Sequence, residues 1–330
     1  MLQSDGGTSR RFSATALWCQ KHLTYALLPR EVAPDRGDVV LNAICSAVSR
    51  GTERLVLIGA VPASEMDRMT CPHQEGAFPF PVKYGYALVG EIVAGPAELV
   101  GERAFALHPH QSVAALDAAN VIVVPEAVPS ARAALAANME TALNVVWDSG
   151  AGPCDRVLVV GGGVVGLLVA RLLARMPGVS VTLCDADAAK RGPAEAMGAA
   201  FVLPEAAPKG VDIAINASGN DKGLATAIAA AGLEARIVEA SWHGAAVASV
   251  PLGGAFHSQR LSIISSQVGR LPPARAPRWT HRRRLEAAMQ LLDDPALDAL
   301  ITHEIAFRDA PARLPPLMTE PGPLAIILRY

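Results

Sequence analysis

At 330 residues the chain is too long for one small domain and suits two. About half of it, 51%, is apolar, and 29 basic residues nearly balance 31 acidic ones, so the net charge of −2 favours neither nucleic acid nor an anionic membrane as a partner. The polar start lacks a signal-peptide pattern, and no apolar run reaches the roughly 20 residues that span a bilayer. Five scattered cysteines without a CxxC pair predict a reduced, cytoplasmic protein without disulfides or a thiolate zinc site.

The first half of the chain has the pattern of a β-rich domain. Residues 14–58 run in short apolar bursts between proline and glycine, "ATALWC", "LTYALLP" and "DVVLNAICSAVS", which predict strands joined by turns. Residues 62–81 are rich in turn residues, and we interpret them as a loop or short helix over a site. Three further strand-like runs, "YALVGEIVAG", "GERAFALH" and "AANVIVVPE", complete a half that we expect to form a partly open barrel.

The pattern changes at Ala131, where a helical stretch begins. From Arg156 onward, strand-like runs such as "RVLVVG", "VSVTLCDA" and "VDIAINAS" alternate with helical ones, which predicts a parallel, doubly wound sheet. One more amphipathic helix, "THRRRLEAAMQLLDDP", carries the basic cluster Arg282–Arg284, which we interpret as a solvated helix face. Two strands, in "ALITHEIAF" and "GPLAIILRY", end the chain.

The strongest chemical signal is "RVLVVGGGVVGLLVARLLAR". Gly161, Gly163 and Gly166 have G-x-G-x-x-G spacing after a strand and at the start of a helix. The first glycine permits a tight turn, the second lets the backbone approach a pyrophosphate, and the third lets helix and strand pack closely. The free N–H groups of the helix N-terminus favour an anion. The stretch therefore predicts a dinucleotide site, and the alternative is a glycine-rich turn without a ligand.

An acidic residue follows at the distance expected for reading the adenosine ribose. The next strand, "VSVTLCDAD", ends at Asp185, 19 residues beyond Gly166. A carboxylate there accepts hydrogen bonds from ribose hydroxyls and repels a 2′-phosphate, so we expect NAD rather than NADP. Lys190 and Arg191 lie close downstream and keep NADP possible.

Five stretches match patterns of a known superfamily: "GYALVGEIV" (family G-H-E-x-x-G-x-V), "GERAF" (family G-D-R-V), "GGGVVG", "AINASGN" and "ALITHEIAF". Over essentially the whole chain, their order resembles the medium-chain dehydrogenase/reductase superfamily of zinc-type alcohol dehydrogenases. Within it, "SRGTERL" and "VKYGY" look most like a branch that includes bacteriochlorophyllide dehydrogenase. The resemblance implies an α/β fold, with a β-rich GroES-like catalytic domain at residues 1–143 and 279–330 and a Rossmann domain, a doubly wound parallel sheet, at residues 144–278.

The resemblance also implies a function: hydride transfer between NAD(H) and an alcohol or carbonyl substrate in the cleft between the domains. It implies cofactor contacts from Val164, Val165, Ala217 and Ser218. A homodimer is implied through the sheet edge near "ARIVEAS" and "LSIISSQ".

The positions of the family's catalytic zinc ligands carry different residues in this sequence. By position they are Ser49, Tyr86 and Glu140, and a hydroxyl and a phenol are poor zinc ligands. Zinc is therefore not expected. His108 and His110, two apart in what looks like a strand, leave open a rebuilt site together with Glu140.

Without zinc, hydrogen-bond donors must stabilise the substrate oxygen. Tyr86 is the first candidate, with Lys83 three residues before it as a cation that would help it exchange a proton. Ser49 and Thr52 are further donors, and His110 is a candidate proton relay.

Each assignment has a plainer alternative. Tyr86 could fill the space that metal and ligand left, and Lys83 could lie at the surface. Glu140 could pair with Arg50.

Three functions therefore remain open from the sequence. The first is a zinc-independent alcohol dehydrogenase or carbonyl reductase. The second is a C=C reductase of the quinone or enoyl type, and the third is a nucleotide-binding protein that has lost catalysis.

Overall fold

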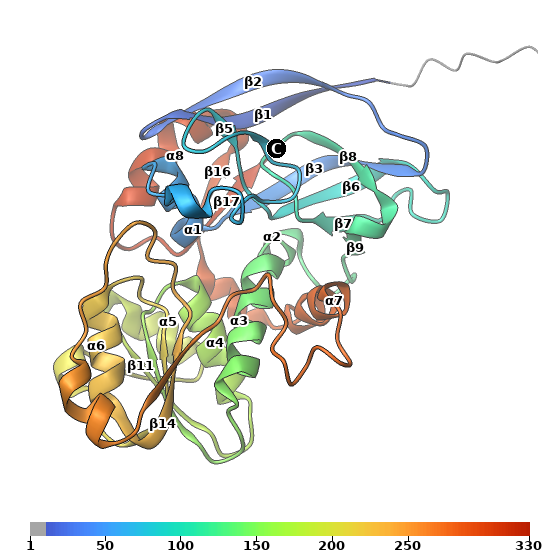
Figure 1. Cartoon of the computed structure of the whole chain (residues 1–330). Coiled ribbons are helices and arrows are strands. Elements are labelled where there is room, and N and C mark those ends of the chain that lie inside the picture. The colour runs from blue at the N-terminus through green and yellow to red at the C-terminus, as the bar shows by residue number, and fades with distance from the viewer. Residues whose placement is uncertain (1–10) are drawn as a thin grey trace, which may run out of the picture.

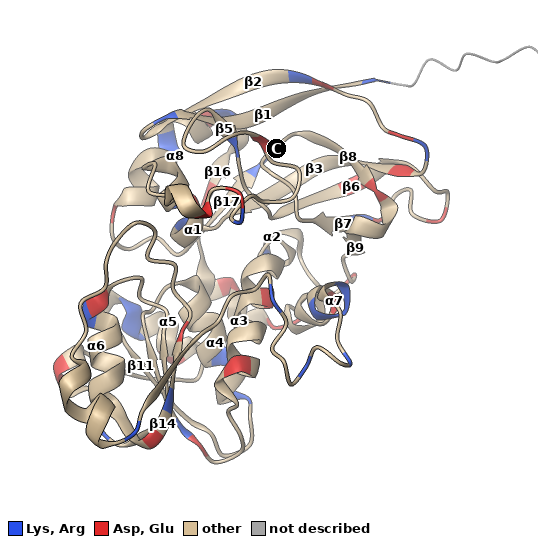
Figure 2. Cartoon of the chain, in the orientation of Figure 1, with Lys and Arg blue, Asp and Glu red and all other residues tan. Residues whose placement is uncertain are grey.

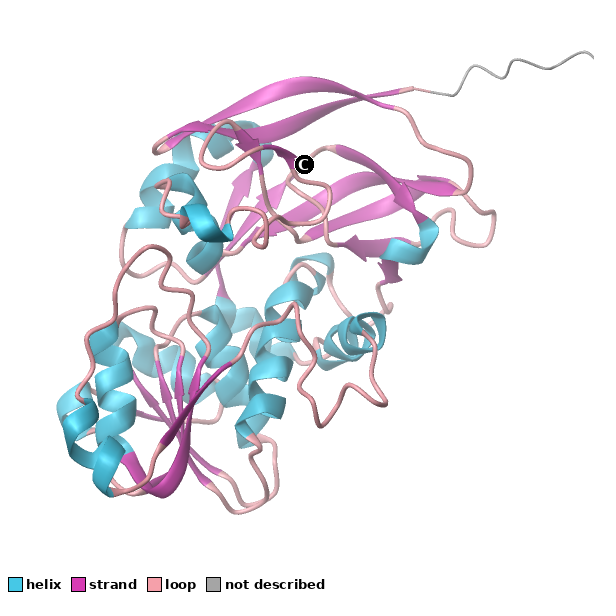
Figure 3. Cartoon of the chain, in the orientation of Figure 1, coloured by secondary structure: helices cyan, strands magenta, loops and turns pink. Residues whose placement is uncertain are grey.

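The computed structural model describes residues 11–330, and these residues form three β-sheets with helices around one of them (Figures 1 and 3). The expectations for residues 1–10, that they carry no signal sequence and begin the first domain, lie outside the described residues. No helix in the described part of the chain is both long and apolar enough to cross a membrane.

The first part of the chain contains two sheets. A seven-stranded sheet has the order β16-β17-β3-β6-β7-β9, with β8 pairing with β3, and a smaller sheet has the order β2-β1-β5-β4. The strands are β1 (Phe12–Lys21), β2 (Thr24–Val32), β3 (Asp38–Val48), β4 (Glu75–Gly76), β5 (Val82–Lys83), β6 (Leu88–Ala94), β7 (Arg103–Ala106), β8 (Val113–Asp117), β9 (Val121–Val123), β16 (Ile301–Ala306) and β17 (Ala325–Arg329). The end of the chain returns to this part, because β17 pairs antiparallel with β3 with Ile326 opposite Val48.

The expected strands between residues 14 and 58 are correct except at the end of this segment. The pattern predicts only strands and turns for residues 14–58, but residues 50–57 form helix α1 (Arg50–Leu57). The reason is visible in the pattern, since Glu53, Val56 and Leu57 are buried and share one helical face. The prediction of strand at His108 and His110 is also wrong, because β7 ends at Ala106 and both histidines lie in the loop before β8.

The second part is a six-stranded sheet of order β12-β11-β10-β13-β14-β15, in which every neighbouring pair is parallel. Its strands are β10 (Arg156–Val160), β11 (Ser180–Cys184), β12 (Ala200–Val202), β13 (Val211–Asn216), β14 (Ala231–Glu239) and β15 (Ser262–Ser265). This is the doubly wound order that reverses beside its first strand. The predicted fold class, a β-rich part together with a Rossmann sheet, is confirmed.

Helices cover the parallel sheet and join it to the first part. They are α2 (Ser130–Ala133), α3 (Ala136–Ser149), α4 (Val164–Ala174), α5 (Arg191–Ala196), α6 (Asp221–Ala230), α7 (His281–Leu291) and α8 (Ala310–Thr319). Short helical turns lie at Ala63–Glu65, Ala118–Asn120, Ala188–Lys190, Pro204–Ala206, Leu252–Phe256, Pro295–Leu300 and Phe307–Asp309. Helix α3 packs against both α4 and α7 and runs across the predicted domain boundary at residue 143.

The basic cluster on α7 does not form one solvated face. Figure 2 shows basic residues on this helix and on the loop before it, and Arg282 and Arg283 are exposed as predicted. Arg284 is only 2% exposed, and its guanidinium donates to Glu140, Asn144 and the carbonyl of Val268. The prediction is therefore wrong for Arg284, because its position on α7 faces α3 rather than solvent.

Candidate active site

A cavity of about 760 Å³ lies where the two parts of the chain meet. One side is formed by the end of β3, the start of α1 and the turn at Tyr86, and the other by the carboxyl ends of the strands β10, β11, β13 and β14. Open α/β sheets bind their ligands in the crevice at this end. The cavity therefore brings the predicted cofactor residues and the predicted hydroxyl donors to one place.

The glycine turn that forms the cofactor side depends on the absence of side chains. Gly161 has a φ of +106°, and a Cβ there would lie 2.7 Å from the carbonyl carbon of Ala217. A Cβ at Gly166 would lie 1.9 Å from the carbonyl oxygen of Gly161, so only glycine lets α4 approach the strand this closely. A Cβ at Gly163 would meet no atom within 4 Å, and Gly163 lines the cavity.

The first turn of α4 is free to bind an anion. Its N-cap is Gly163, and no side chain caps it. The helix is 11 residues long, and its leading N–H groups and partial positive charge suit a pyrophosphate. Gly161, Gly163, Val164 and Val165 line the cavity, while Gly166 lies buried beneath them. These residues fit a dinucleotide.

Asp185 lines the same cavity at the end of β11. Its Oδ2 accepts the N–H of Gly162 at 2.6 Å and its Oδ1 accepts the N–H of Asp187 at 2.8 Å, so the carboxylate is fixed beside the glycine turn. The two downstream cations have other partners. Lys190 donates to the carbonyl of Gly322 at 2.7 Å, and the guanidinium of Arg191 lies 4.9 Å from the ring centre of Phe201.

The loop after β13 completes the cofactor side. Ala217 and Ser218 line the cavity, and both the N–H and the hydroxyl of Ser218 donate to the buried Asn216, at 3.2 and 2.7 Å. Asn216 in turn donates to Glu239 on β14 at 2.7 Å. Sequence reasoning did not single out Asn216, although it lies within the stretch "AINASGN".

Three hydroxyl side chains form the opposite side, and we call Ser49, Thr52 and Tyr86 the hydroxyl wall. All three line the cavity. Burial, and after it the charge of Glu53, raise the pKa of Tyr86 to about 12, although hydrogen bonding with Ser49 and Thr52 acts in the opposite direction. The phenol is therefore protonated at neutral pH and able to donate a hydrogen bond. Its ring meets Tyr84 edge-on, with 6.0 Å between ring centres.

Lys83 does not belong to this wall. It is 1% exposed and does not line the cavity. Its amine donates to Glu75 at 2.6 Å and to Gln111 at 2.9 Å. Neither the candidate role beside Tyr86 nor the alternative of a surface lysine agrees with this placement. The two-residue strand β5 turns Lys83 toward β4, away from the cavity.

Glu140 is also placed away from the wall. Its carboxylate pairs with Arg284 at 3.0 Å, not with Arg50. Asn138 and Thr141, three apart on α3, line the cavity, whereas Glu140 lies on another face of the same helix. Glu140 therefore joins α3 to α7, and the suggested pairing with Arg50 is wrong.

His110 is buried behind the wall rather than at its surface. Its ring nitrogens lie 2.8 Å from the hydroxyl of Ser46 and 3.0 Å from the carboxylate of Glu53, and the side chain is 1% exposed. It does not reach the cavity or the solvent, so the predicted role as a relay to solvent has no path here. Glu53 was not selected from the sequence, and its position in "SRGTE" was the only signal available.

The loop at residues 62–81 packs beside Tyr86 but does not itself line the cavity. Met66, Cys71 and Phe80 instead pack against the apolar cluster of the first part of the chain.

The donor atoms present do not match a zinc site. Across residues 11–330, no group of three or more His, Cys, Asp or Glu residues is arranged to hold a metal. Glu140 lies away from Ser49 and Tyr86, and hydroxyls are poor zinc ligands. His108 and His110 do not rebuild a site with Glu140, because His108 bonds to the carbonyl of Pro109 and His110 to Ser46 and Glu53. Zinc independence itself stays a prediction.

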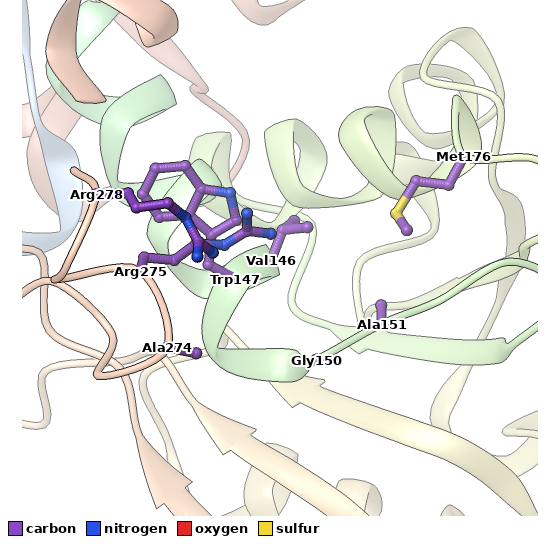
Figure 4. A pocket seen from close by; sticks show the side chains of 8 residues that line it. All are labelled: Val146, Trp147, Gly150, Ala151, Met176, Ala274, Arg275 and Arg278. Carbon is purple, nitrogen blue, oxygen red and sulfur yellow. The ribbon is translucent and has the colours of Figure 1, made fainter. Parts of the chain in front are cut away.

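A second cavity, of about 500 Å³, lies at the C-terminal end of α3 (Figure 4). Trp147, Met176, Arg275 and Arg278 are among its lining residues. The guanidinium of Arg275 lies 5.1 Å from the ring centre of Trp147, which in turn packs on Trp279. The stacking on Trp147 accounts for Arg275 without a ligand.

Comparison with solved structures identifies the class of fold. L-idonate 5-dehydrogenase from Escherichia coli superposes with a TM-score of 0.80 at 12% sequence identity, covering 97% of this chain and 99% of that one. A protein from Escherichia coli described as a short chain alcohol dehydrogenase, in complex with NADH, gives 0.75 at 19% identity, covering 96% and 99%. A protein from Sinorhizobium meliloti described as a zinc-binding dehydrogenase, bound to NADP, gives a TM-score of 0.74 at 18% identity, covering 97% of this chain and 100% of that one.

The chain therefore has the two-part fold of these dehydrogenases along nearly its whole length. At such identities the likeness establishes the fold alone. No protein-family model matches the sequence, and the comparison with curated proteins gave no significant match. The narrower resemblance to a zinc-lacking branch stays a prediction.

Proposed function

We propose that the protein is an NAD-dependent oxidoreductase of the medium-chain alcohol dehydrogenase type that works without zinc. It would transfer a hydride between the cofactor and an alcohol or carbonyl substrate. One observation carries the proposal: a single cavity is lined on one side by the glycine turn with Asp185 and on the other by the hydroxyl wall. Solved dehydrogenases with this fold, bound to NADH or NADP, add support.

Several contacts favour NAD over NADP. Asp185 presents a fixed carboxylate where the adenosine ribose would lie, and a carboxylate repels a 2′-phosphate. Lys190 and Arg191, the cations that could receive that phosphate, already bind Gly322 and Phe201.

The hydroxyl wall supplies the chemistry on the substrate side. Bound NADH supplies the hydride for the carbonyl carbon. The negative charge that then develops on the substrate oxygen needs donors, and one well-placed donor contributes about 3 kcal/mol. Tyr86, with its pKa raised to about 12, is protonated and donates, while Ser49 and Thr52 orient the phenol or donate directly. A proton donated to the substrate oxygen by these hydrogen-bonded hydroxyls then completes the alcohol.

The proposal is tested by measuring zinc content, cofactor binding and hydride transfer on the same preparation. We expect substoichiometric zinc, a larger thermal shift with NADH than with NADPH, and oxidation of NADH with a panel of aldehydes and ketones. Stoichiometric zinc would overturn the zinc-free mechanism. A C–C product would indicate the C=C reductase, and NADH binding without any transfer would indicate a protein that has lost catalysis.

We also propose a homodimer through the edge of the parallel sheet. Strand β15 is one of the two outer strands of that sheet, and within residues 11–330 its outer edge has no strand partner. Light scattering on the purified protein would measure the mass, and a monomer at micromolar concentration would contradict the proposal.

A further inference from the structure

A buried pair of titratable side chains lies directly behind the hydroxyl wall. The carboxylate of Glu53 lies 3.0 Å from the imidazole of His110, and the two side chains are 4% and 1% exposed. Neither lines the cavity. Burying such a pair costs desolvation energy, and its contribution to stability is often small. The contacts that the pair makes with the wall are therefore the better guide to its role.

Glu53 holds the Ser49 end of the wall. Its second carboxylate oxygen accepts the N–H of Ser49 at 2.7 Å. Ser49 is the N-cap residue of α1, and its own side chain makes no capping hydrogen bond. The hydroxyl of Ser49 is thus not used by the helix, while its backbone is fixed by a charge-assisted bond from one turn further along.

His110 holds the Tyr86 end. A Cβ at Gly85 would lie 2.9 Å from Nε2 of His110, so the turn before Tyr86 rests directly on the imidazole ring. Gly85 has a φ of +131°, a conformation that this contact and the turn both require. The other ring nitrogen bonds to Ser46, whose hydroxyl lies 3.0 Å from that of Tyr330. The ring is therefore fixed on both sides.

We propose that Glu53 and His110 are positioning residues of the hydride-transfer site. Together they hold the Ser49 and Tyr86 ends of the hydroxyl wall at a fixed separation and keep a carboxylate behind it. This inference rests on the proposed function, since it assigns the pair to that site.

The carboxylate also acts on the wall through its charge. Burial is the first cause of the raised pKa of Tyr86 and the charge of Glu53 the second, and Cys71 and Tyr84 are the further titratable groups beside the phenol. The same carboxylate pairs with His110, and its charge also raises the pKa of Cys19, Tyr25 and Tyr330. Removing the charge of Glu53 therefore lowers the pKa of Tyr86 toward the ordinary value of a phenol, about 10.

The first test separates positioning from stability with a matched pair of variants. Glu53→Gln keeps the shape and an acceptor for the Ser49 N–H but removes the charge. Asp294→Asn is the control, because Asp294 is another buried carboxylate that accepts a backbone N–H and pairs with a base, Arg171, outside the cavity. We expect a kcat about tenfold lower for Glu53→Gln, with an unchanged Kd for NADH, and an unchanged kcat for Asp294→Asn.

Equal kcat values for the two variants would overturn the proposal. If Glu53→Gln does not fold, Ser46→Ala tests the pair from its other end, because it removes the partner of His110 Nδ1. We then expect kcat to fall about threefold with the Kd for NADH unchanged. An unchanged kcat in that variant would also overturn the proposal.

The second test does not depend on activity. The ultraviolet absorbance of the protein is measured against pH with Tyr86 present and in the Tyr86→Phe variant. The difference between the two curves reports the ionisation of the Tyr86 phenol alone. When Glu53 is present, we expect the Tyr86 phenol to ionise little below pH 11. In the Glu53→Gln background we expect it to ionise at lower pH. Circular dichroism confirms that both proteins remain folded. An unshifted titration overturns the role of Glu53. Failure of hydride transfer by the wild type would overturn the proposed function and leave this titration interpretable.

Discussion

The two sides of the cavity are built in different ways. On the cofactor side, six consecutive residues, Gly161–Gly166, supply the turn and the start of α4, and the ligand would meet mainly backbone. On the substrate side, the three hydroxyls come from two segments, and side chains from β3, α1, the β7–β8 loop and the end of the chain hold them. The first side depends on local geometry and the second on long-range contacts.

This difference predicts how each side responds to substitution. A substitution in the glycine turn acts by steric exclusion, so one added methyl group is enough to weaken or abolish cofactor binding. A substitution behind the hydroxyl wall displaces the wall side chains or changes the charge near them. Its effect on kcat is therefore partial, and its size depends on which hydrogen-bond partner remains.

The largest effect is expected from a methyl group at Gly166. In Gly166→Ala the new Cβ would lie 1.9 Å from the carbonyl of Gly161, and the clash involves backbone that cannot move aside. We expect NADH binding to be lost, measured by fluorescence titration, and the free energy of unfolding to fall by about 3 kcal/mol.

Gly163→Ala is the matched control for that prediction. Its Cβ has no neighbour within 4 Å, so the melting temperature should not change. The Kd for NADH should rise about 10- to 100-fold, because the methyl group enters the space of the pyrophosphate. Unchanged binding in this variant would show that the ligand does not approach the turn here.

Tyr86→Phe addresses the wall itself. Loss of one donor to the developing oxyanion should lower kcat about 100-fold and leave the Kd for NADH unchanged. Thr52→Val, which removes a neighbouring hydroxyl at similar volume, should have a smaller effect. Full activity in Tyr86→Phe would mean that the ring only fills space.

Two substitutions of His110 test how much its long-range contacts contribute to activity and stability. His110→Ala removes the ring under Gly85 and leaves Glu53 buried without its partner, so we expect kcat to fall about tenfold and the free energy of unfolding to fall by about 3 kcal/mol. His110→Gln retains a donor for Glu53 and should recover part of both. Equal kcat values for the two variants would contradict a positioning role.

The smallest effect is expected at Asp185. Asp185→Asn keeps the side-chain shape and removes the charge that faces the ribose. The Kd for NADH should rise about fivefold while the Kd for NADPH falls. The protein's preference for NADH over NADPH therefore becomes smaller. Isothermal titration with both cofactors measures the ratio, and an unchanged ratio would remove Asp185 from cofactor selection.

Much of the cofactor side could be predicted because its information is contiguous. The glycine spacing, the preceding strand and the acid at the end of the next strand all lie between residues 156 and 185. The doubly wound sheet then followed from the alternation of strand and helix patterns, and it is confirmed. Helix α1 was missed because its eight residues follow directly on a strand and are shorter than most helices that periodicity detects.

The residues of the first part illustrate what could not be predicted. Lys83, Glu140 and His110 have the chemistry of catalytic groups, and nothing in their sequence neighbourhood says which way they face. Each is buried in a pair with a residue from another segment, namely Glu75, Arg284 and Glu53. Conversely, Glu53 bonds to Ser49 four residues before it and to His110 57 residues away. Only the second contact connects it to the Tyr86 end of the wall, and no local pattern reveals that contact.

By itself, the sequence determined most of the elements and the glycine turn, because periodicity and the conformational freedom of glycine act over a few residues. Only the tertiary structure decided which polar side chains reach the cavity. Side-chain direction on a helix or loop depends on what packs against it, and here those neighbours are Arg284 behind Glu140, Glu75 beside Lys83 and Glu53 beneath Ser49.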